Sequence, residues 1–452
     1  MLGIEHGIVL LIEFPDMKFS MDDPWQHYND MMMKPGFDYA FSETSKYRHN
    51  GSIHDYFYDC SDGKYDLQLE VFGPLMMPDS VRHYAAHSDR LAWEMIVKGC
   101  QQLDDSIDFS RFDNDGDGII DFVATIYAGP GSNASGVSEN QAIWPHQWTI
   151  GAAGGGQNYV DSLLISTYVC VNETYGGRPD GMGTFCHEFS HILGLPDLYY
   201  GSNMTPSGYD LMDDGAYNLN GFRPAAYTAY ERYELGWLQP TPLTEADVYT
   251  LPALTMESKA YIVPVTQGID DPREGEYYLF ENRQPYAWDE YLPGFGMLVW
   301  HIDFDASRWA VNSPNGWSTH QCVDLVEANG KKNDSSVPFP GSAGRTSFTD
   351  DTKPAFRGWT NPGHNTSAMD VRLEKPIYNI RLSELAPELV PSDAIEGETF
   401  YDVKFDFLVD ISAIKEICIE NNVSGTARIE VREGRTIINT GQRSHDLFGR
   451  SL

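Results

Sequence analysis

The stretch Thr-Phe-Cys-His-Glu-Phe-Ser-His-Ile-Leu-Gly-Leu-Pro-Asp-Leu-Tyr, residues 184–199, decides how the rest of the chain is interpreted. If these residues form a helix, His187 and His191 share one face, and both imidazoles can bind one metal ion. Glu188 lies between them, close enough to act as a general base on a water that the ion holds. A chance His-Glu-x-x-His on an ordinary amphipathic helix is the competing interpretation.

The residues after the second histidine favour a metal site over chance. Gly194 stands where the helix must end, because glycine adopts the left-handed conformation at a helix exit without a Cβ clash. Pro196 prevents the helix from resuming, and Asp197 then returns as a third ligand that suits zinc. Two imidazoles, a carboxylate and one open position indicate a catalytic zinc site. Glu231, on a later predicted helix, is an alternative third ligand that the spacing disfavours.

A second metal site is predicted in the acidic loop Asp-Asn-Asp-Gly-Asp-Gly-Ile-Ile-Asp, residues 113–121. Calcium takes about six to eight oxygen ligands, which this density of donors suits. The expected ligands are four carboxylates and one backbone carbonyl: Asp113, Asp115, Asp117, Ile119 (carbonyl) and Asp121. An EF-hand would need a glutamate where Ala124 stands, so the loop has EF-hand-like chemistry without the second helix. The alternative is an acidic surface turn that binds nothing.

Composition describes a folded, well-solvated protein of two or three domains. The chain has 452 residues, of which 41% are hydrophobic and 21% charged, and its net charge is −35 at pH 7. This charge argues against a nucleic-acid partner, because phosphates would be repelled. No apolar stretch reaches the roughly 18 residues that a membrane span needs. The six cysteines are too few and too dispersed for a disulfide framework.

Patterns along the chain predict mixed helices and strands first and mostly strands later. Strands are predicted at residues 7–14, 65–71 and 122–127, and helices at residues 88–103 and 225–237. Ser88 is expected to cap the first helix. From about residue 245 the chain consists of short β-rich runs, which predicts a mostly β module. No signal peptide is recognisable, so a leader for export would lie outside this numbering.

The long motif His-Glu-x-x-His-x-x-Gly-x-x-Asp resembles that of the metzincin clan of zinc peptidases. The continuation Leu-Gly-Leu-Pro-Asp-Leu-Tyr resembles the immune-inhibitor-A-like family of secreted bacterial metallopeptidases, and similar stretches extend over residues 5–382. The resemblance implies a turn with a methionine beneath the metal, which Tyr-Asp-Leu-Met-Asp matches, so Met212 would supply an apolar floor. Other metzincins often have a tyrosine two residues later; Asp214 stands there, and Tyr217 is the nearest phenol.

The resemblance also implies which segments border a substrate cleft. The strand at residues 122–127 is expected at the edge of the cleft, where it would pair with an extended substrate. Tyr217 is a candidate cleft residue on the same grounds. His146 follows a Trp-Pro pair and either lines the cleft or is an ordinary core or surface histidine.

The implied architecture is an α/β metzincin-like zinc peptidase catalytic domain followed by a mostly β, sandwich-like module. We expect the catalytic domain with its calcium loop at residues 1–242, the β-rich module at 243–410 and a C-terminal β segment at 411–452. The implied function is that of a secreted or cell-surface, zinc-dependent endopeptidase, a monomer acting on protein or peptide substrates. Two alternatives are a non-catalytic adhesin with a vestigial zinc site and a zinc hydrolase of a non-peptide amide. The intact Glu188 argues against the adhesin, because a site that only binds zinc needs no base.

Overall fold

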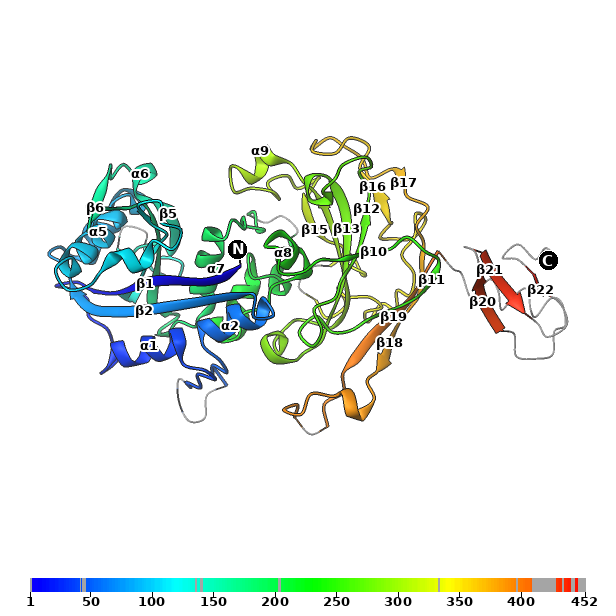
Figure 1. Cartoon of the computed structure of the whole chain (residues 1–452), viewed down its shortest axis with the longest axis horizontal. Helices are drawn as coiled ribbons and strands as arrows, with labels where there is room; N and C mark the ends of the chain where they lie inside the picture. The colour runs from blue at the N-terminus through cyan, green and yellow to red at the C-terminus, as the bar shows by residue number, and fades with distance from the viewer. Residues whose placement is uncertain are drawn as a thin grey trace. The chain divides into compact units, whose positions relative to one another are not determined.

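The chain forms two compact units in the computed structural model (Figure 1). The first comprises Met1–Pro196, Asp210–Tyr227 and Leu235–Trp237, and the second Asp197–Tyr209, Thr228–Glu234 and Leu238–Leu452. The residues that the structure describes are 2–40, 42, 46–134, 136–138, 141–201, 205–331, 334–395 and 397–408, with three short strands after residue 427. The expected domain boundaries stay predictions, and most of the expected C-terminal segment lies outside the described residues.

A six-stranded sheet organises the first unit, in the order β2-β1-β4-β8-β5 with β9 paired to β8. Its strands are β1 (Gly3–Glu13), β2 (Tyr65–Met76), β4 (Val123–Pro130), β5 (His146–Thr149), β8 (Thr167–Tyr175) and β9 (Arg178–Pro179). The strands β2, β1, β4 and β8 are parallel, whereas β5 is antiparallel to β8. The predicted strand at residues 7–14 is confirmed as the centrally placed β1, whose apolar run is buried because both faces of the sheet are covered.

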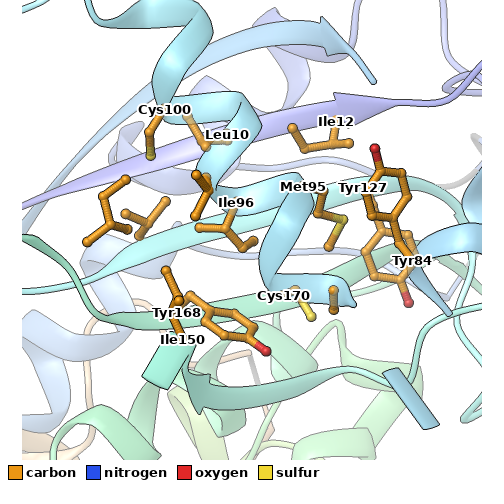
Figure 2. Packing of buried hydrophobic residues seen from close by; sticks show 14 of the residues in the cluster. Leu10, Ile12, Tyr84, Met95, Ile96, Cys100, Tyr127, Ile150, Tyr168 and Cys170 are labelled. Carbon is orange, nitrogen blue, oxygen red and sulfur yellow. The ribbon is translucent and has the colours of Figure 1, made fainter. Parts of the chain in front are cut away.

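Helix α5 (Ala92–Leu103) covers one face of this sheet. Figure 2 shows Met95 and Ile96 of α5 packed over Leu10 and Ile12 of β1, and all four side chains are buried. The helix predicted at residues 88–103 is therefore confirmed from Ala92 onward. The expected cap Ser88 is wrong: it has φ 55°, in the left-handed region, and the helix begins four residues later without a side-chain cap.

The opposite face of the sheet carries aromatic packing from two helices, α2 (Ile53–Cys60) and α7 (Gly183–Ile192). The ring of Phe189 on α7 contacts the rings of Phe57 and Phe122, with centroids 5.1 and 4.9 Å apart. Successive side chains of a strand point to opposite faces, so β1 supplies both cores from one apolar run. Helix α7, which carries the histidine motif, thus rests on a rigid layer.

The predicted position of the strand at residues 122–127, at the edge of the cleft, is wrong. Residues 123–127 do belong to a strand, β4, but it lies between β1 and β8 in the interior of the sheet. Both of its edges are hydrogen-bonded to neighbours, so it cannot pair with a substrate. The edge of the sheet on that side is β5, the only strand on the main path that runs antiparallel to its neighbour.

Shorter elements complete the first unit. A three-stranded sheet has the order β3-β7-β6. The bounds are α1 (Pro24–Met33), α3 (Val81–Tyr84), α4 (Ala86–Asp89), η1 (Phe109–Phe112), β3 (Ile119–Ile120), α6 (Ile150–Ala153), β6 (Asn158–Val160), β7 (Leu163–Ile165) and η3 (Asp214–Gly221).

The second unit is rich in strands, as predicted. Its sheets have the orders β10-β12-β13-β14-β15, β11-β19-β18 and β16-β17. The bounds are η2 (Ser207–Tyr209), α8 (Ala229–Glu234), β10 (Thr241–Pro242), β11 (Asp247–Leu251), β12 (Tyr261–Pro264), η4 (Pro272–Glu274), β13 (Glu276–Arg283), η5 (Ala287–Asp289), β14 (Gly296–Asp303), α9 (Ala306–Trp309), β15 (Val323–Leu325), β16 (Arg357–Gly358), β17 (Val371–Arg372), β18 (Ile377–Glu384), η6 (Pro387–Leu389) and β19 (Tyr401–Phe407). Three further strands, β20 (Arg428–Arg432), β21 (Arg435–Asn439) and β22 (Ser444–His445), form an antiparallel sheet.

The composition predicts neither a membrane-spanning helix nor a disulfide framework. Within the described part of the chain, no helix combines the length and the apolar character needed to cross a bilayer. Five cysteines are described, and all are free and buried: Cys60, Cys100, Cys170, Cys186 and Cys322. Cys418 lies outside the described residues.

Candidate functional site

The predicted histidine helix is confirmed as α7, and a close backbone approach fixes its start. A Cβ on Gly183, the first residue of the helix, would lie 1.8 Å from the carbonyl oxygen of Ala216. Only glycine allows this approach, because the obstacle is backbone rather than a movable side chain. The helix is thereby held against the segment that follows Met212.

The helix ends in the turn that the glycine predicts. Gly194 has φ +97°, its N–H donates to the carbonyl of His191 at 3.1 Å, and the N–H of Leu195 donates to the carbonyl of Ser190 at 3.1 Å. These two bonds are those of a Schellman motif, in which the residue after the last helical turn is left-handed. The turn sends the chain back through Pro196 toward the histidine face.

The structure brings the three expected zinc ligands together within one continuous stretch of chain. Ligand atoms of His187, His191 and Asp197 all lie within 4.8 Å of one another. The two imidazole rings are nearly perpendicular, at 86°, with centroids 5.1 Å apart. Two nitrogens and one carboxylate oxygen match the protein donor set of catalytic zinc sites, which leave a fourth position open.

Backbone carbonyls select the histidine nitrogens that face the metal position. Nδ1 of His187 is 2.9 Å from the carbonyl oxygen of Leu211, and Nδ1 of His191 is 2.8 Å from that of Leu195. A carbonyl only accepts, so each Nδ1 carries the proton and each Nε2 keeps its lone pair. Zinc-binding histidines have this arrangement, in which the outer nitrogen donates to a fixed acceptor. The donor set therefore fits zinc.

Asp197 is oriented by a residue that the sequence did not suggest. The side-chain amide of Asn312 donates to Oδ2 of Asp197 at 2.6 Å, and its oxygen accepts the backbone N–H of Asp197 at 2.7 Å. This pair of bonds fixes both the main chain and the carboxylate of Asp197. Asn312 lies in no motif and 115 positions away in the chain, so only the fold could reveal it.

The segment expected to form the methionine turn contacts the first histidine. Leu211, whose carbonyl accepts from His187, directly precedes Met212. Met212 is buried, and its N–H donates to Oδ1 of Asp210 at 2.8 Å, which closes the turn. The role of Met212 as the floor of the site stays a prediction.

Glu188 and Tyr217 lie in the same region of the first unit. Glu188 is on α7 with 8% of its surface exposed. Burial raises the pKa of Tyr217, the Asn133 amide that donates to its hydroxyl at 3.5 Å opposes the shift, and the charges of Asp180 and Glu188 add to it. The ring of Tyr217 also stacks on Tyr175 of β8, with centroids 5.4 Å apart.

His146 lies on the edge strand β5, with its ring turned toward the core under α5. Its Nδ1 is 2.6 Å from the carbonyl of Trp144, and its Nε2 is 3.0 Å from the hydroxyl of Tyr168. It lines a pocket of about 410 Å³ together with these two residues, Trp148 and residues 88–90. Burial lowers the pKa of His146, and the Trp144 carbonyl and Glu188 oppose that shift, so the ring is held largely neutral at pH 7.

Glu231, the alternative third ligand, caps the N-terminus of helix α8. Its Oε2 accepts the backbone N–H of Thr228 at 2.7 Å, and the hydroxyl of Thr228 accepts the N–H of Glu231 at 3.3 Å. These reciprocal bonds form a capping box that starts helix α8 at Ala229. The helix expected at residues 225–237 is therefore shorter than predicted, because Thr228 caps it and Gly236, with φ +74°, follows its end.

Three of the five expected calcium ligands converge. Asp113, Asp115 and Asp117 each offer an oxygen within 4.8 Å of the others. The carboxylate of Asp113 also accepts the N–H groups of Gly116, Asp117 and Gly118 at 2.9 to 3.1 Å, which wraps the loop. Ile119 opens the short strand β3, directly after this wrap.

The fourth carboxylate of the loop, Asp121, is bonded elsewhere. Its Oδ2 accepts the backbone N–H of Asn114 at 3.1 Å and its side-chain amide at 2.5 Å. Asn114 in turn bonds the N–H and the carbonyl of His6, at 2.8 and 3.0 Å. The loop is thus fastened to strand β1 through Asn114.

Comparison with known proteins adds an independent finding. Residues 5–239 match the model of the family described as immune inhibitor A peptidase M6, catalytic domain. The chain is similar to the pre-pro-metalloprotease PrtV of Vibrio cholerae, with 25% identity over 333 residues, which cover 61% of this chain and 36% of the relative. It is also similar to immune inhibitor A of Bacillus thuringiensis subsp. alesti, with 28% identity over 230 residues, 42% of this chain and 33% of the relative.

The chain spans about a third of the length of these relatives, 36% and 33%. The family match, in contrast, covers more than half of the chain and contains the whole histidine motif, the methionine segment and the acidic loop. The chain therefore belongs to the immune inhibitor A family of M6 peptidases.

Proposed function

We propose that this protein is a secreted, zinc-dependent endopeptidase with a metzincin-like catalytic domain. The observation that carries the proposal is the convergence of His187, His191 and Asp197, with Nδ1 of both histidines bonded to backbone carbonyls. Family membership supports the reaction class, and the relative named pre-pro-metalloprotease supports export and a protein substrate. The sandwich-like packing of the second unit and the monomeric state belong to the same proposal.

In this proposal the chain's own residues have distinct roles. His187, His191 and Asp197 hold zinc, which when bound lowers the pKa of a coordinated water and polarises a carbonyl. Glu188 accepts the proton of the attacking water and returns it to the nitrogen of the cleaved amide. Met212 supplies the apolar floor that keeps water from the protein side of the ligands.

The proposal is tested by digestion of a casein-type substrate before and after removal of zinc with a chelator. We expect cleavage that stops on chelation and returns when zinc is added back. An adhesin with a vestigial site would bind zinc and cleave nothing. A hydrolase of non-peptide amides would leave casein intact yet hydrolyse a simple acyl amide in a zinc-dependent manner.

Asn312 provides a prediction about the affinity for zinc. Asn312→Gly removes the amide that fixes Asp197 and suits the left-handed conformation of this residue, φ 52°. We expect the zinc dissociation constant to rise about 10- to 100-fold, as it does when other supporting hydrogen bonds to metal ligands are removed. Competition with a fluorescent zinc chelator measures the change.

Two further variants check the cause of that change. Asn312→Asp keeps the shape of the side chain but places a second carboxylate against that of Asp197. We expect the two carboxylates to repel each other and zinc binding to weaken further. Tighter binding would mean that the new carboxylate itself binds the ion. Asn50→Gly alters another exposed loop asparagine, outside both proposed zinc sites, and should leave the affinity unchanged. Equal affinities of Asn312→Gly and the unaltered protein would contradict a positioning role.

We also propose that the loop at residues 113–121 binds calcium, with Asp113, Asp115, Asp117, Ile119 (carbonyl) and Asp121 as ligands. Three converging carboxylates and the fastening of the loop to β1 support this. Calcium at about 100 times its dissociation constant stabilises the folded state by about 2.7 kcal/mol. We expect Tm of the chelator-treated protein to rise by about 5–10 °C.

The double variant Asp115→Asn, Asp117→Asn should abolish the calcium-dependent rise in Tm. Asp105→Asn, which alters an exposed carboxylate outside the loop, should keep it. A rise of the same size in the double variant would show that calcium binds at another place, and no rise in the unaltered protein would show that the loop is an acidic turn.

A further inference from the structure

A second group of metal-binding side chains lies in the β-rich unit, away from the histidine helix in the sequence. Asp303 ends strand β14, Cys322 directly precedes β15, and His320 lies two residues before Cys322. Their ligand atoms lie within 4.8 Å of one another, and each residue is at most 1% exposed. We call these three residues the buried cluster.

The imidazole of His320 directs its Nε2 toward the carboxylate of this cluster. Its Nδ1 is 2.8 Å from the carbonyl oxygen of His364, so Nδ1 carries a proton. Its Nε2 is 2.7 Å from Oδ2 of Asp303, but the carboxylate lies off the direction in which an Nε2–H would point, and this nitrogen has no hydrogen-bond partner. A cation bound by Nε2 and the carboxylate would satisfy both buried groups.

Cys322 has an environment that supports a thiolate ligand. The guanidinium of Arg308 donates to Sγ at 2.9 Å and is itself 5% exposed. Burial raises the pKa of the Cys322 thiol to about 12, while Arg308 lowers it. Zinc binding deprotonates a coordinating thiol outright, so the burial of the free thiol does not oppose a metal-bound thiolate.

We propose that the buried cluster is a structural zinc site, with Asp303, His320 and Cys322 as ligands. Zinc–ligand distances of about 2.0–2.3 Å in a tetrahedron place donor atoms about 3.3–3.8 Å apart. The three donors lie within 4.8 Å of one another, and the 2.7 Å between Nε2 of His320 and Oδ2 of Asp303 would lengthen when the ion binds. A thiolate and an imidazole select zinc over calcium or magnesium, which prefer oxygen. Complete burial leaves no path for a substrate, so the ion would have a structural rather than a catalytic role.

The site would lie beside the paired ends of β14 and β15, where the N–H of Asp303 donates to the carbonyl of Cys322 at 2.9 Å. The N–H of Gly363 donates to Oδ2 of Asp303 at 2.7 Å, and Trp359 stacks on His320 with centroids 3.8 Å apart. The loop at residues 359–364 therefore surrounds the cluster contributed by the end of β14 and the start of β15. An ion held there would fix the segment with His320 to the end of β14, and the loop packs against both.

Cobalt substitution tests the proposal, because a thiolate bound to Co²⁺ gives a near-ultraviolet charge-transfer band and the proposed catalytic site has no thiolate. All proteins carry Cys418→Ser, since this cysteine lies outside the described residues. We expect about two zinc ions per chain by elemental analysis, and the charge-transfer band after exchange with cobalt. Cys322→Ser should lose the band, and His320→Ala should lose one zinc ion.

Matched variants separate this site from the proposed catalytic one. His187→Ala should lose the other zinc ion and keep the band, and Cys100→Ser, which alters a buried thiol outside the cluster, should change neither. Absence of the band in the cobalt-loaded parent protein overturns the proposal even if Cys322→Ser fails to fold. A band that persists in folded Cys322→Ser overturns it as well.

Discussion

Replacing Glu188 with glutamine is expected to lower kcat/KM for a peptide substrate by about 10²–10⁴-fold while zinc content stays unchanged. Glutamine has nearly the same shape as glutamate but cannot accept the proton of the attacking water. Glu188 is on the same helix as His187 and His191 and is not among the clustered ligand atoms, so its neutralisation should leave the metal in place. Steady-state kinetics on a quenched fluorescent peptide, with zinc measured in the same sample, give both quantities.

Glu234→Gln is a matched control for that substitution. Glu234 is a partly buried glutamate at the end of helix α8, and burial raises its pKa to about 7, although the Tyr277 hydroxyl opposes this. Because glutamate is already partly protonated there at neutral pH, glutamine should change little. Activity retained in Glu188→Gln, or lost equally in both variants, would contradict Glu188 as the general base.

The second large effect is expected for Asp197→Ala, which should raise the zinc dissociation constant more than about 100-fold and abolish activity at micromolar zinc. Removal of a direct ligand should cost more than removal of a supporting hydrogen bond, which costs about 10- to 100-fold. Excess zinc should restore part of the zinc content but little activity, because two imidazoles alone do not fix the geometry of the ion. Equilibrium dialysis and kinetics across a zinc titration measure both effects.

Glu231→Gln separates the two carboxylates that the sequence offered as third ligand. It weakens the capping box of α8, and we expect the free energy of unfolding to fall by about 0.5–2 kcal/mol. Zinc affinity should not change, because Glu231 is not among the clustered ligand atoms. Loss of zinc in Glu231→Gln with retention in Asp197→Ala would reverse the assignment.

Local features of this chain were predictable from sequence because local geometry determines them. The helix with His187 and His191 follows from spacing, and its end follows from the left-handed preference of Gly194. The continuous apolar run of β1 likewise predicted a strand that is covered on both faces. The alternating run of β2 predicted a strand with one solvent-exposed face. The β-rich texture after residue 245 predicted the character of the second unit.

Features that depend on distant segments were missed or misplaced. The position of β4 inside the sheet follows from pairing with β1 and β8, which no pattern within residues 122–127 encodes. Ser88 is an acceptable cap by residue type, but the chain there takes left-handed conformations and starts the helix later. Asn312 carries no motif and acquires its place beside Asp197 only in the folded chain. Glu231 is a carboxylate that the sequence offered as a zinc ligand, but in the folded chain it forms the capping box at the start of α8.

The orientation of both imidazoles depends on main-chain oxygens at Leu195 and Leu211, and every amino acid possesses such an oxygen. Exchange of either leucine for another residue alters packing but cannot delete the acceptor. The orientation of the histidine rings therefore depends on the backbone conformation. Most single-residue substitutions nearby should leave it unchanged. Insertions, deletions or new prolines in these two turns are the changes through which a descendant of this protein would lose its metal.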